Sequence, residues 1–202
     1  MSEVARTDGV HAIGTPRPEG TGDRPGVGGV MLRWWGRCLD VDNGAARAAR
    51  ARLRHASGPA DVLALAVTHE LYHDIRNAEG GRDLREGSGP QRLTLIAAVL
   101  AGIESHDGAT LARRFGPLRS GEAPALSSMR FQRLLRAPDD WALAVALRRA
   151  LPLVNRTANV TRLGTDLLHW GERTRSRWCF DYFGAPSPQG LRDDANDHKE
   201  DT

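Results

Sequence analysis

Apolar side chains recur every three to four residues through most of this chain, which is the spacing of one face of an α-helix. No stretch alternates apolar and polar residues as a half-buried strand would, and no hairpin turn signal is present. Gly, Pro and polar clusters separate the periodic segments. The pattern predicts about eight helices, near residues 30–39, 44–55, 60–76, 91–105, 109–115, 125–137, 139–151 and 158–183.

Two of these segments indicate how the fold is organised. Segment 91–105 is apolar nearly all round, which predicts the buried central helix of the first half. Segment 158–183 reads as one long helix with an apolar stripe beside a polar stripe. Asp139 stands where its carboxylate can accept hydrogen bonds from the first backbone N–H groups of segment 139–151, so it is the expected N-cap. The fold class predicted is therefore all-α.

A Gly- and Pro-bearing linker at 116–124 suggests two small helical subdomains in a compact protein. The expected N-terminal subdomain is 30–118, and the C-terminal subdomain is 119–184. Residues 1–29 are rich in Gly and Pro and have little apolar periodicity, while residues 185–202 are acidic. Both flanking segments are predicted to be disordered tails.

Positive charge is concentrated in the C-terminal half. The whole chain carries a net charge of +3, but residues 113–177 hold thirteen arginines against five acidic residues. An arginine-rich composition throughout the chain explains part of this excess, so position carries more information than number. Clustered arginine on a helical surface is typical of proteins that bind a polyanion, most often nucleic acid.

Two arginine patterns predict the binding surface. Arg130, Arg133 and Arg136 recur every three residues and should share one edge of a helix. In the long segment, Arg173 and Arg177 fall on the polar stripe with Arg162, Asp166 and His169. Asp166 is expected to pair with Arg162, which would leave Arg173 and Arg177 more available. Trp170 and Trp178 are expected in the core rather than as base-stacking platforms.

One motif suggests a different chemistry. His69-Glu70-Leu71-Tyr72-His73 matches H-E-x-x-H, in which two histidines bind zinc and the glutamate activates water. No convincing third ligand follows it, and helix-packing histidines explain the motif more simply. A zinc hydrolase built on His69, Glu70 and His73 stays as a remote alternative.

Other catalytic signatures are absent from the sequence. There is no phosphate-binding loop after a strand, no nucleophile elbow and no Cys/His spacing for a metal or a nucleophile. We therefore expect no enzymatic activity, no cofactor and no resident metal. The two cysteines, the lack of a secretion signal and the lack of a long apolar run predict a cytoplasmic protein with no membrane partner.

Three stretches resemble a known family. They are the run Arg130–Arg136, Asn159-Val160-Thr161-Arg162-Leu163, and Asp166–Trp178 with its sequence DLLHWGERTRSRW. Together they are similar to the CasB family, the small subunit of the type I-E CRISPR Cascade complex. The N-terminal half agrees more loosely, through Trp34-Trp35 and the helix end at Leu53-Arg54. The resemblance covers about residues 30–184.

The resemblance implies a non-catalytic subunit that stabilises a crRNA-guided antiviral complex. Its implied partners are the backbone and large Cascade subunits, a second copy of itself, crRNA, and target DNA, chiefly the displaced strand of the R-loop. Binding would involve the nucleic-acid backbone without sequence specificity. The implied nucleic-acid-binding residues are Arg54, Arg130, Arg133, Arg136, Arg173, Arg175 and Arg177. A scaffold that contacts only proteins through its basic face is the alternative.

Overall fold

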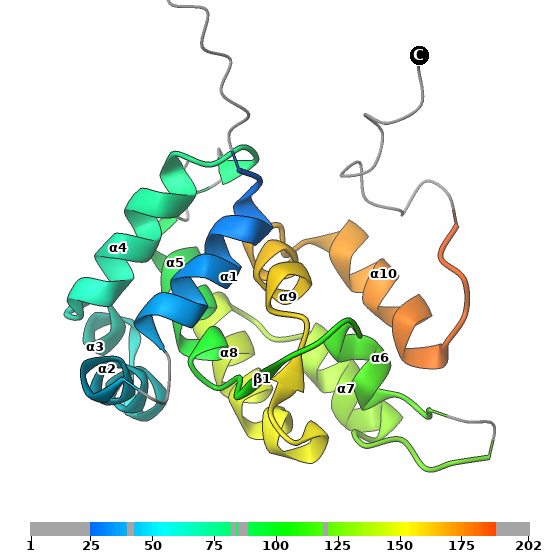
Figure 1. The fold of residues 1–202 in the computed structure, drawn as a ribbon. Coiled ribbons are helices and arrows are strands. Elements are labelled where there is room, and N and C mark those ends of the chain that lie inside the picture. The colour runs from blue at the N-terminus through cyan, green and yellow to red at the C-terminus, as the bar shows by residue number, and fades with distance from the viewer. Residues whose placement is uncertain (1–24, 40–42, 82–83, 85–88, 119–120, 189–202) are drawn as a thin grey trace, which may run out of the picture.

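The computed structural model describes residues 25–39, 43–81, 84, 89–118 and 121–188 (Figure 1). This part of the chain is mostly helical, which confirms the predicted all-α class. Its ten α-helices are α1 Val27–Cys38, α2 Gly44–His55, α3 Pro59–Leu63, α4 Ala66–Arg76, α5 Gly89–Leu100, α6 Leu111–Phe115, α7 Ser128–Leu135, α8 Asp140–Ala150, α9 Val160–Leu168 and α10 Glu172–Phe183.

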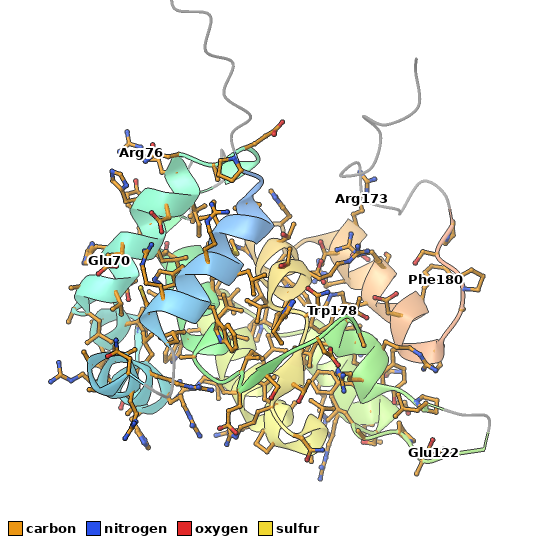
Figure 2. All side chains as sticks on the ribbon, in the orientation of Figure 1. Glu70, Arg76, Glu122, Arg173, Trp178 and Phe180 are labelled. Carbon is orange, nitrogen blue, oxygen red and sulfur yellow. The ribbon has the colours of Figure 1, made fainter. Side chains whose placement is uncertain are left out.

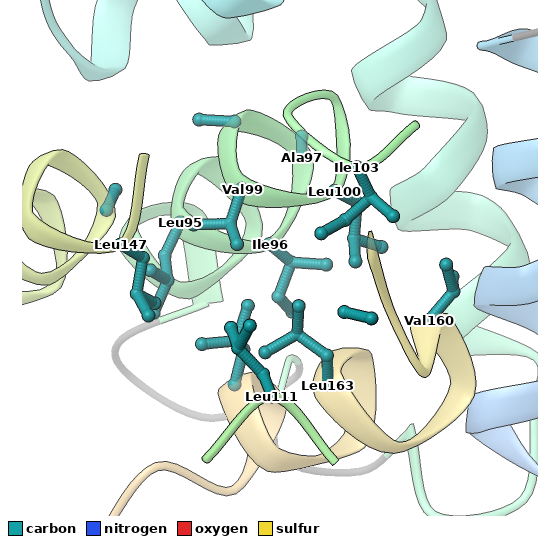
Figure 3. Close-up of a cluster of buried hydrophobic side chains, with 14 of the residues drawn as sticks. Leu95, Ile96, Ala97, Val99, Leu100, Ile103, Leu111, Leu147, Val160 and Leu163 are labelled. Carbon is teal, nitrogen blue, oxygen red and sulfur yellow. The ribbon is translucent and has the colours of Figure 1, made fainter. Parts of the chain in front are cut away.

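Helix α5 forms the centre of the core, as its apolar sequence predicts. Residues Leu95 to Leu100 are fully buried, and α5 packs against α8 and α9. Figure 3 shows its side chains meeting Leu111 of α6, Leu147 of α8 and Leu163 of α9. Burial of this apolar surface is the main force that holds the helices together.

Helices from both predicted subdomains contribute to the same hydrophobic cluster. Helix α1 lies against α9 and α4, and α5 of the first half lies against α8 of the second. The predicted boundary near 119 therefore does not divide the core into two. The division into an N-terminal subdomain, 30–118, and a C-terminal subdomain, 119–184, stays a prediction.

The first helix begins earlier than predicted. The sequence pattern places residues 27–29 in the N-terminal tail, but α1 starts at Val27, and residues 1–24 lie outside the described part of the chain. The reason is close packing: a Cβ atom at Gly28 would come within 2.6 Å of Cγ2 of Thr161 on α9. Gly164 of α9 lies in turn against Met31 of α1. Glycines that look like tail composition thus allow two helices to approach closely.

Two segments predicted as single helices are each broken in two. Segment 60–76 breaks between α3 and α4, where Leu65 is extended and the Thr68 hydroxyl donates to the Val62 carbonyl at 2.7 Å. Segment 158–183 breaks between α9 and α10, where Gly171 is extended and the Thr174 hydroxyl donates to the His169 carbonyl at 2.7 Å. In both places a threonine hydroxyl satisfies a carbonyl near the end of the first helix.

A short pair of strands also departs from the prediction. Strands β1 Ser105–His106 and β2 Thr157–Ala158 pair in parallel, so the predicted helix 91–105 ends at Leu100 instead. A 3₁₀ helix, Leu151–Val154, and two residues with positive φ, Asn155 and Arg156, lead the chain into β2.

Side-chain caps fix several helix starts. Asp139 accepts a hydrogen bond from the Ala142 backbone N–H at 2.8 Å, which confirms the predicted N-cap of α8. Asn43 and Thr110 cap α2 and α6 in the same way. None of the helices in the described residues is long and apolar enough to cross a lipid bilayer.

Candidate nucleic-acid interface

Helix α7 presents a row of arginines to solvent, which we call the α7 edge: Arg130, Arg133 and Arg136. All three side chains are exposed, and within the described residues none has an ion pair or hydrogen bond through its guanidinium. Arg136 is the C-cap residue, immediately after the last residue of the helix. Because guanidinium groups carry their charge at all physiological pH values, the edge is a fixed line of positive charge.

The opposite face of α7 anchors the edge to the body of the protein. Phe131 and Leu134 are buried, and the ring of Phe131 stacks on Tyr182 of α10 with centroids 4.2 Å apart. The Tyr182 hydroxyl donates to the Leu126 carbonyl just before α7, at 2.7 Å. The backbone under the arginine row is therefore held by buried aromatic packing at the C-terminal half of α10.

The arginines of α10 lie in three different environments. Arg173 is exposed and projects from the first turn of the helix (Figure 2). Arg175 is half-buried and forms an ion pair with Glu172 at 3.0 Å. Arg177 is only 7% exposed. The prediction that Arg173 and Arg177 would both be available on one exposed stripe is wrong for Arg177, because Asp166 of α9 lies against that part of α10 and pairs with its guanidinium.

Arg177 belongs to a buried polar cluster between α9 and α10. Its guanidinium donates to one carboxylate oxygen of Asp166, and the indole N–H of Trp178 donates to the other at 2.6 Å. Trp178 is 1% exposed, as its predicted core role requires, and Trp170 packs edge-on against it with centroids 4.9 Å apart. A guanidinium in this position joins two helices and is not available to a phosphate.

Arg54 lies in a second basic region, at the end of α2. A pocket of about 390 Å³ opens there, between α2 and α8. It is lined by Arg54, His55, Ala56, Ser57, Gly102, Trp141, Val145, Arg148, Arg149 and Arg156. Arg54 and Arg156 both contact the carboxylate of Glu104, at 3.3 and 3.5 Å. Four arginines thus surround one pocket, and one carboxylate is shared by two of them.

Arg148 differs from the other arginines of this pocket because it completes a helix end. Its guanidinium donates to the backbone carbonyls of Arg54 and Ala56, the last carbonyls of α2. Burial and the neighbouring Arg54 lower the pKa of Arg148. The group remains charged, and its charge lies at the negative end of the α2 dipole.

Sequence reasoning missed most of this pocket. Its residues come from four separate parts of the chain, and no local motif connects them. A signal did exist for another missed residue: Ala46, Arg50 and Leu53 follow helical spacing and are all buried. Arg50 donates to the Leu39, Ala101 and Ile103 carbonyls, so it is a structural arginine. Burial lowers its pKa.

The H-E-x-x-H residues are engaged in local contacts on α4. Nε2 of His69 lies 2.8 Å from the Leu63 carbonyl oxygen, and Nδ1 of His73 lies 3.2 Å from the Asn77 side-chain amide. The Glu70 carboxylate accepts from the thiol of Cys38 at 3.4 Å. Across the residues described, no three His, Cys, Asp or Glu side chains are grouped as metal ligands.

Comparison with known proteins gives two matches. Residues 49–183 match the family described as CRISPR-associated protein Cse2. One chain of the crystal structure of E. coli Cascade bound to a PAM-containing dsDNA target aligns with a TM-score of 0.54 and 22% identity, covering 75% of this chain and 93% of that chain. At this identity the structural match establishes a shared fold. No curated protein matches the chain.

Proposed function

This chain belongs to the Cse2 family of CRISPR-associated proteins, and from that premise we propose that it is the small subunit of a type I-E Cascade complex that holds nucleic-acid backbone. Cse2 is another name for CasB, so the resemblance found in the sequence is confirmed. In this role the subunit is non-catalytic and cytoplasmic. It neutralises phosphates of the displaced DNA strand without reading bases, since the guide RNA reads the sequence by base pairing.

The α7 edge carries this proposal. Three guanidinium groups with no partner among the described residues stand in a row on a helix whose other face is buried. An exposed ion pair would in any case contribute little to stability, so these side chains are not needed to hold the fold together. A row spaced at about one helical turn instead suits successive phosphates of a single strand, which guanidinium groups bind by two parallel hydrogen bonds.

The other implied residues contribute unequally. Arg173 is exposed, so it extends the surface onto α10. Arg54 and Arg175 each have a carboxylate partner, Glu104 and Glu172, from which a phosphate would have to displace them. Arg177 is removed from the proposed surface because it is buried against Asp166.

The proposed partners follow from the family and from the solved structure in which one chain shares this fold. That structure is of a Cascade bound to dsDNA. The partners are the other Cascade subunits, crRNA, and target DNA. A second copy of this chain beside the first would lengthen the basic surface, since each copy presents one α7 edge.

Salt-dependent binding tests the proposal directly. We would titrate a labelled single-stranded DNA with the full chain by fluorescence anisotropy at 50 and 200 mM salt. The α7 edge and Arg173 supply four phosphate contacts, which by themselves should lower the affinity about 50-fold across this range. The double variant Arg130→Ala/Arg133→Ala should reduce this loss of affinity about seven-fold, since two of the contacts are removed.

The control variant Arg33→Ala/Arg52→Ala removes the same charge from exposed arginines of α1 and α2. It should keep the wild-type salt dependence. If both double variants behave alike, general electrostatic attraction explains the binding and the α7 edge is not the site.

A protein-only scaffold is the second candidate, and exposed apolar side chains favour it. Met129, next to Arg130 on α7, is 64% exposed, and Phe183 at the end of α10 is also 64% exposed. An exposed apolar side chain loses contact with water when a partner protein covers it, which favours association. The charge-reversal variant Arg133→Glu separates the two functions: loss of co-purification with the other subunits indicates a scaffold, whereas intact assembly with unstable R-loops indicates DNA binding.

A further inference from the structure

The pocket between α2 and α8 is larger than a phosphate contact requires. Its volume of about 390 Å³ falls within the range of roughly 300–1,000 Å³ that is usual for small-molecule sites. It is also distinct from the α7 edge, because none of Arg130, Arg133 and Arg136 lines it. Its shape and chemistry therefore need an explanation of their own.

One side of the pocket is cationic. Arg149 is exposed at the last turn of α8 and has no hydrogen-bond or ion-pair partner among the described residues. Arg54 and Arg156 share the single carboxylate of Glu104. Three guanidinium groups and one carboxylate give this side of the pocket a net positive charge. An anion inside the pocket would neutralise that charge.

Backbone geometry fixes one of these arginines in place. Asn155 and Arg156 both have φ of 53°, a left-handed conformation that non-glycine residues rarely adopt. Hydrogen bonds compensate: the Arg156 N–H donates to the Leu151 carbonyl at 3.0 Å, and the Arg156 carbonyl accepts from the Glu104 N–H at 2.8 Å. These bonds fix the backbone of Arg156, and its side chain contacts Glu104 at the pocket, 3.5 Å away.

Another side of the pocket is aromatic and apolar. The half-buried indole of Trp141 and the side chain of Val145, both on α8, line it. The guanidinium of Arg148 lies 5.9 Å from the centroid of the Trp141 ring, at the outer limit of a cation–π contact. An aromatic surface beside a cationic one matches a nucleotide, which has a flat base at one end and a phosphate at the other.

We propose that this pocket takes one nucleotide of a bound single strand, with its phosphate at Arg149, Arg156 and Arg54 and its base against Trp141. The inference rests on the proposed function, because it requires a nucleic-acid strand on this protein. The path is short: Arg136 ends the α7 edge five residues before Trp141, so at most about 18 Å of chain separates them. A strand that follows the α7 edge reaches the pocket without a large detour.

The test compares two labelled strands of twenty residues in anisotropy titrations with the full chain. One is oligothymidylate, and the other has the same phosphates but abasic sugars throughout. The wild type should bind oligothymidylate roughly five-fold more tightly or more, from one stacked base. The Trp141→Leu variant should bind oligothymidylate and the abasic strand with similar affinity. The Trp141→Phe variant keeps an aromatic ring, so it should still prefer oligothymidylate.

Arg149→Ala tests the phosphate end of the pocket. It should weaken binding of both strands and reduce the slope of log affinity against log salt by about 0.7. Arg52→Ala, an exposed arginine of α2 outside the pocket, should leave this slope unchanged. Circular dichroism melts of every variant exclude misfolding as the cause.

Two results overturn the inference alone: a thymidylate preference that persists in Trp141→Leu, or an Arg149→Ala variant that matches Arg52→Ala. In both cases the salt dependence of Arg130→Ala/Arg133→Ala still reports on the α7 edge. Failure of the wild type to bind either strand at low salt overturns the proposed function together with the pocket.

Discussion

The carboxylate of Asp166 on α9 is the counter-charge of the Arg177 guanidinium on α10, and both groups are almost fully excluded from solvent. The same carboxylate accepts from the indole N–H of Trp178. Two helices that meet at a break in the chain are thus joined by one acid and two donors. Tyr182 of α10 also stacks on Phe131 of α7. The orientation of α10 therefore affects the position of α7.

The substitution Asp166→Asn should destabilise the fold. The asparagine side chain would keep an acceptor and nearly the same shape, but it would leave Arg177 as a buried charge without its carboxylate. Removal of one partner from a buried ion pair lowers the free energy of unfolding by about 3–5 kcal/mol. Urea denaturation followed by circular dichroism measures the loss in the free energy of unfolding.

Glu172→Gln is the matched control, because Glu172 pairs with Arg175 but its side chain is 83% exposed. An exposed pair contributes at most about 1 kcal/mol. Equal stability losses in the two variants would show that burial does not make the Asp166–Arg177 pair special.

Glycine-to-alanine changes within α1 should have opposite effects at two positions. At Gly36 an added methyl group would have no neighbour within 4 Å, so Gly36→Ala should stabilise the helix by about 1 kcal/mol. At Gly28 the same methyl would come within 2.6 Å of the Thr161 methyl and 3.1 Å of its carbonyl oxygen. Gly28→Ala should therefore destabilise by about 1–3 kcal/mol. Thermal melts of both variants decide the matter, and stabilisation at both positions would contradict the close approach of α1 to α9.

Local features of the sequence predicted the helices well. Periodicity identified the buried α5, and Asp139 marked the start of α8, because both depend on neighbouring residues. The breaks at Leu65 and Gly171 were missed, since helical periodicity continues across them and the threonine hydroxyls that satisfy the carbonyls there leave no mark on that periodicity. Glycines at 28 and 164 could not be assigned a role until α1 and α9 were seen together.

The candidate site shows the same division. The α7 edge was visible in the sequence because three arginines on one helix share a spacing. The burial of Arg177 was not, because its partner Asp166 lies eleven positions away on another helix. The pocket was least predictable of all, since Arg54, Trp141 and Arg156 meet only through long-range folding.

Stability at alkaline pH should depend on Tyr182. Burial raises the pKa of Tyr182 above its ordinary value of 10.0, and its hydroxyl donates to the Leu126 carbonyl. Because the folded protein keeps this proton where the unfolded chain releases it, the contribution of Tyr182 is full below pH 10.0 and is lost as the pH rises through the folded pKa.

Tyr182→Phe should therefore be less stable than the wild type by about 1 kcal/mol at pH 9, and the difference should shrink towards about pH 11. Urea titrations at the two pH values measure it. Phe131→Leu removes the non-titrating ring of the same stack, so its stability loss should be similar at both values. If the stability difference between Tyr182→Phe and the wild type stayed constant or grew as the pH rose, the pKa of Tyr182 would not be raised in the folded protein.

Neighbouring arginines of α8 should separate stability from binding. Arg148→Met keeps much of the aliphatic length but removes the hydrogen bonds to the Ala56 and Arg54 carbonyls. It should lower the free energy of unfolding by about 1–3 kcal/mol, since the last carbonyls of α2 lose their donor. Arg149→Ala should change it by at most about 0.5 kcal/mol, because the side chain is exposed and has no partner among the described residues.

Binding should show the reverse order once stability is taken into account. At a temperature where both variants are folded, Arg149→Ala should weaken single-stranded DNA binding more than Arg148→Met does, because the Arg148 guanidinium is already committed to two carbonyls. Chemical denaturation and anisotropy on the same preparations give both quantities. A larger binding defect in folded Arg148→Met would instead place the phosphate contact on the capping arginine, and the division of roles between the two neighbours would be wrong.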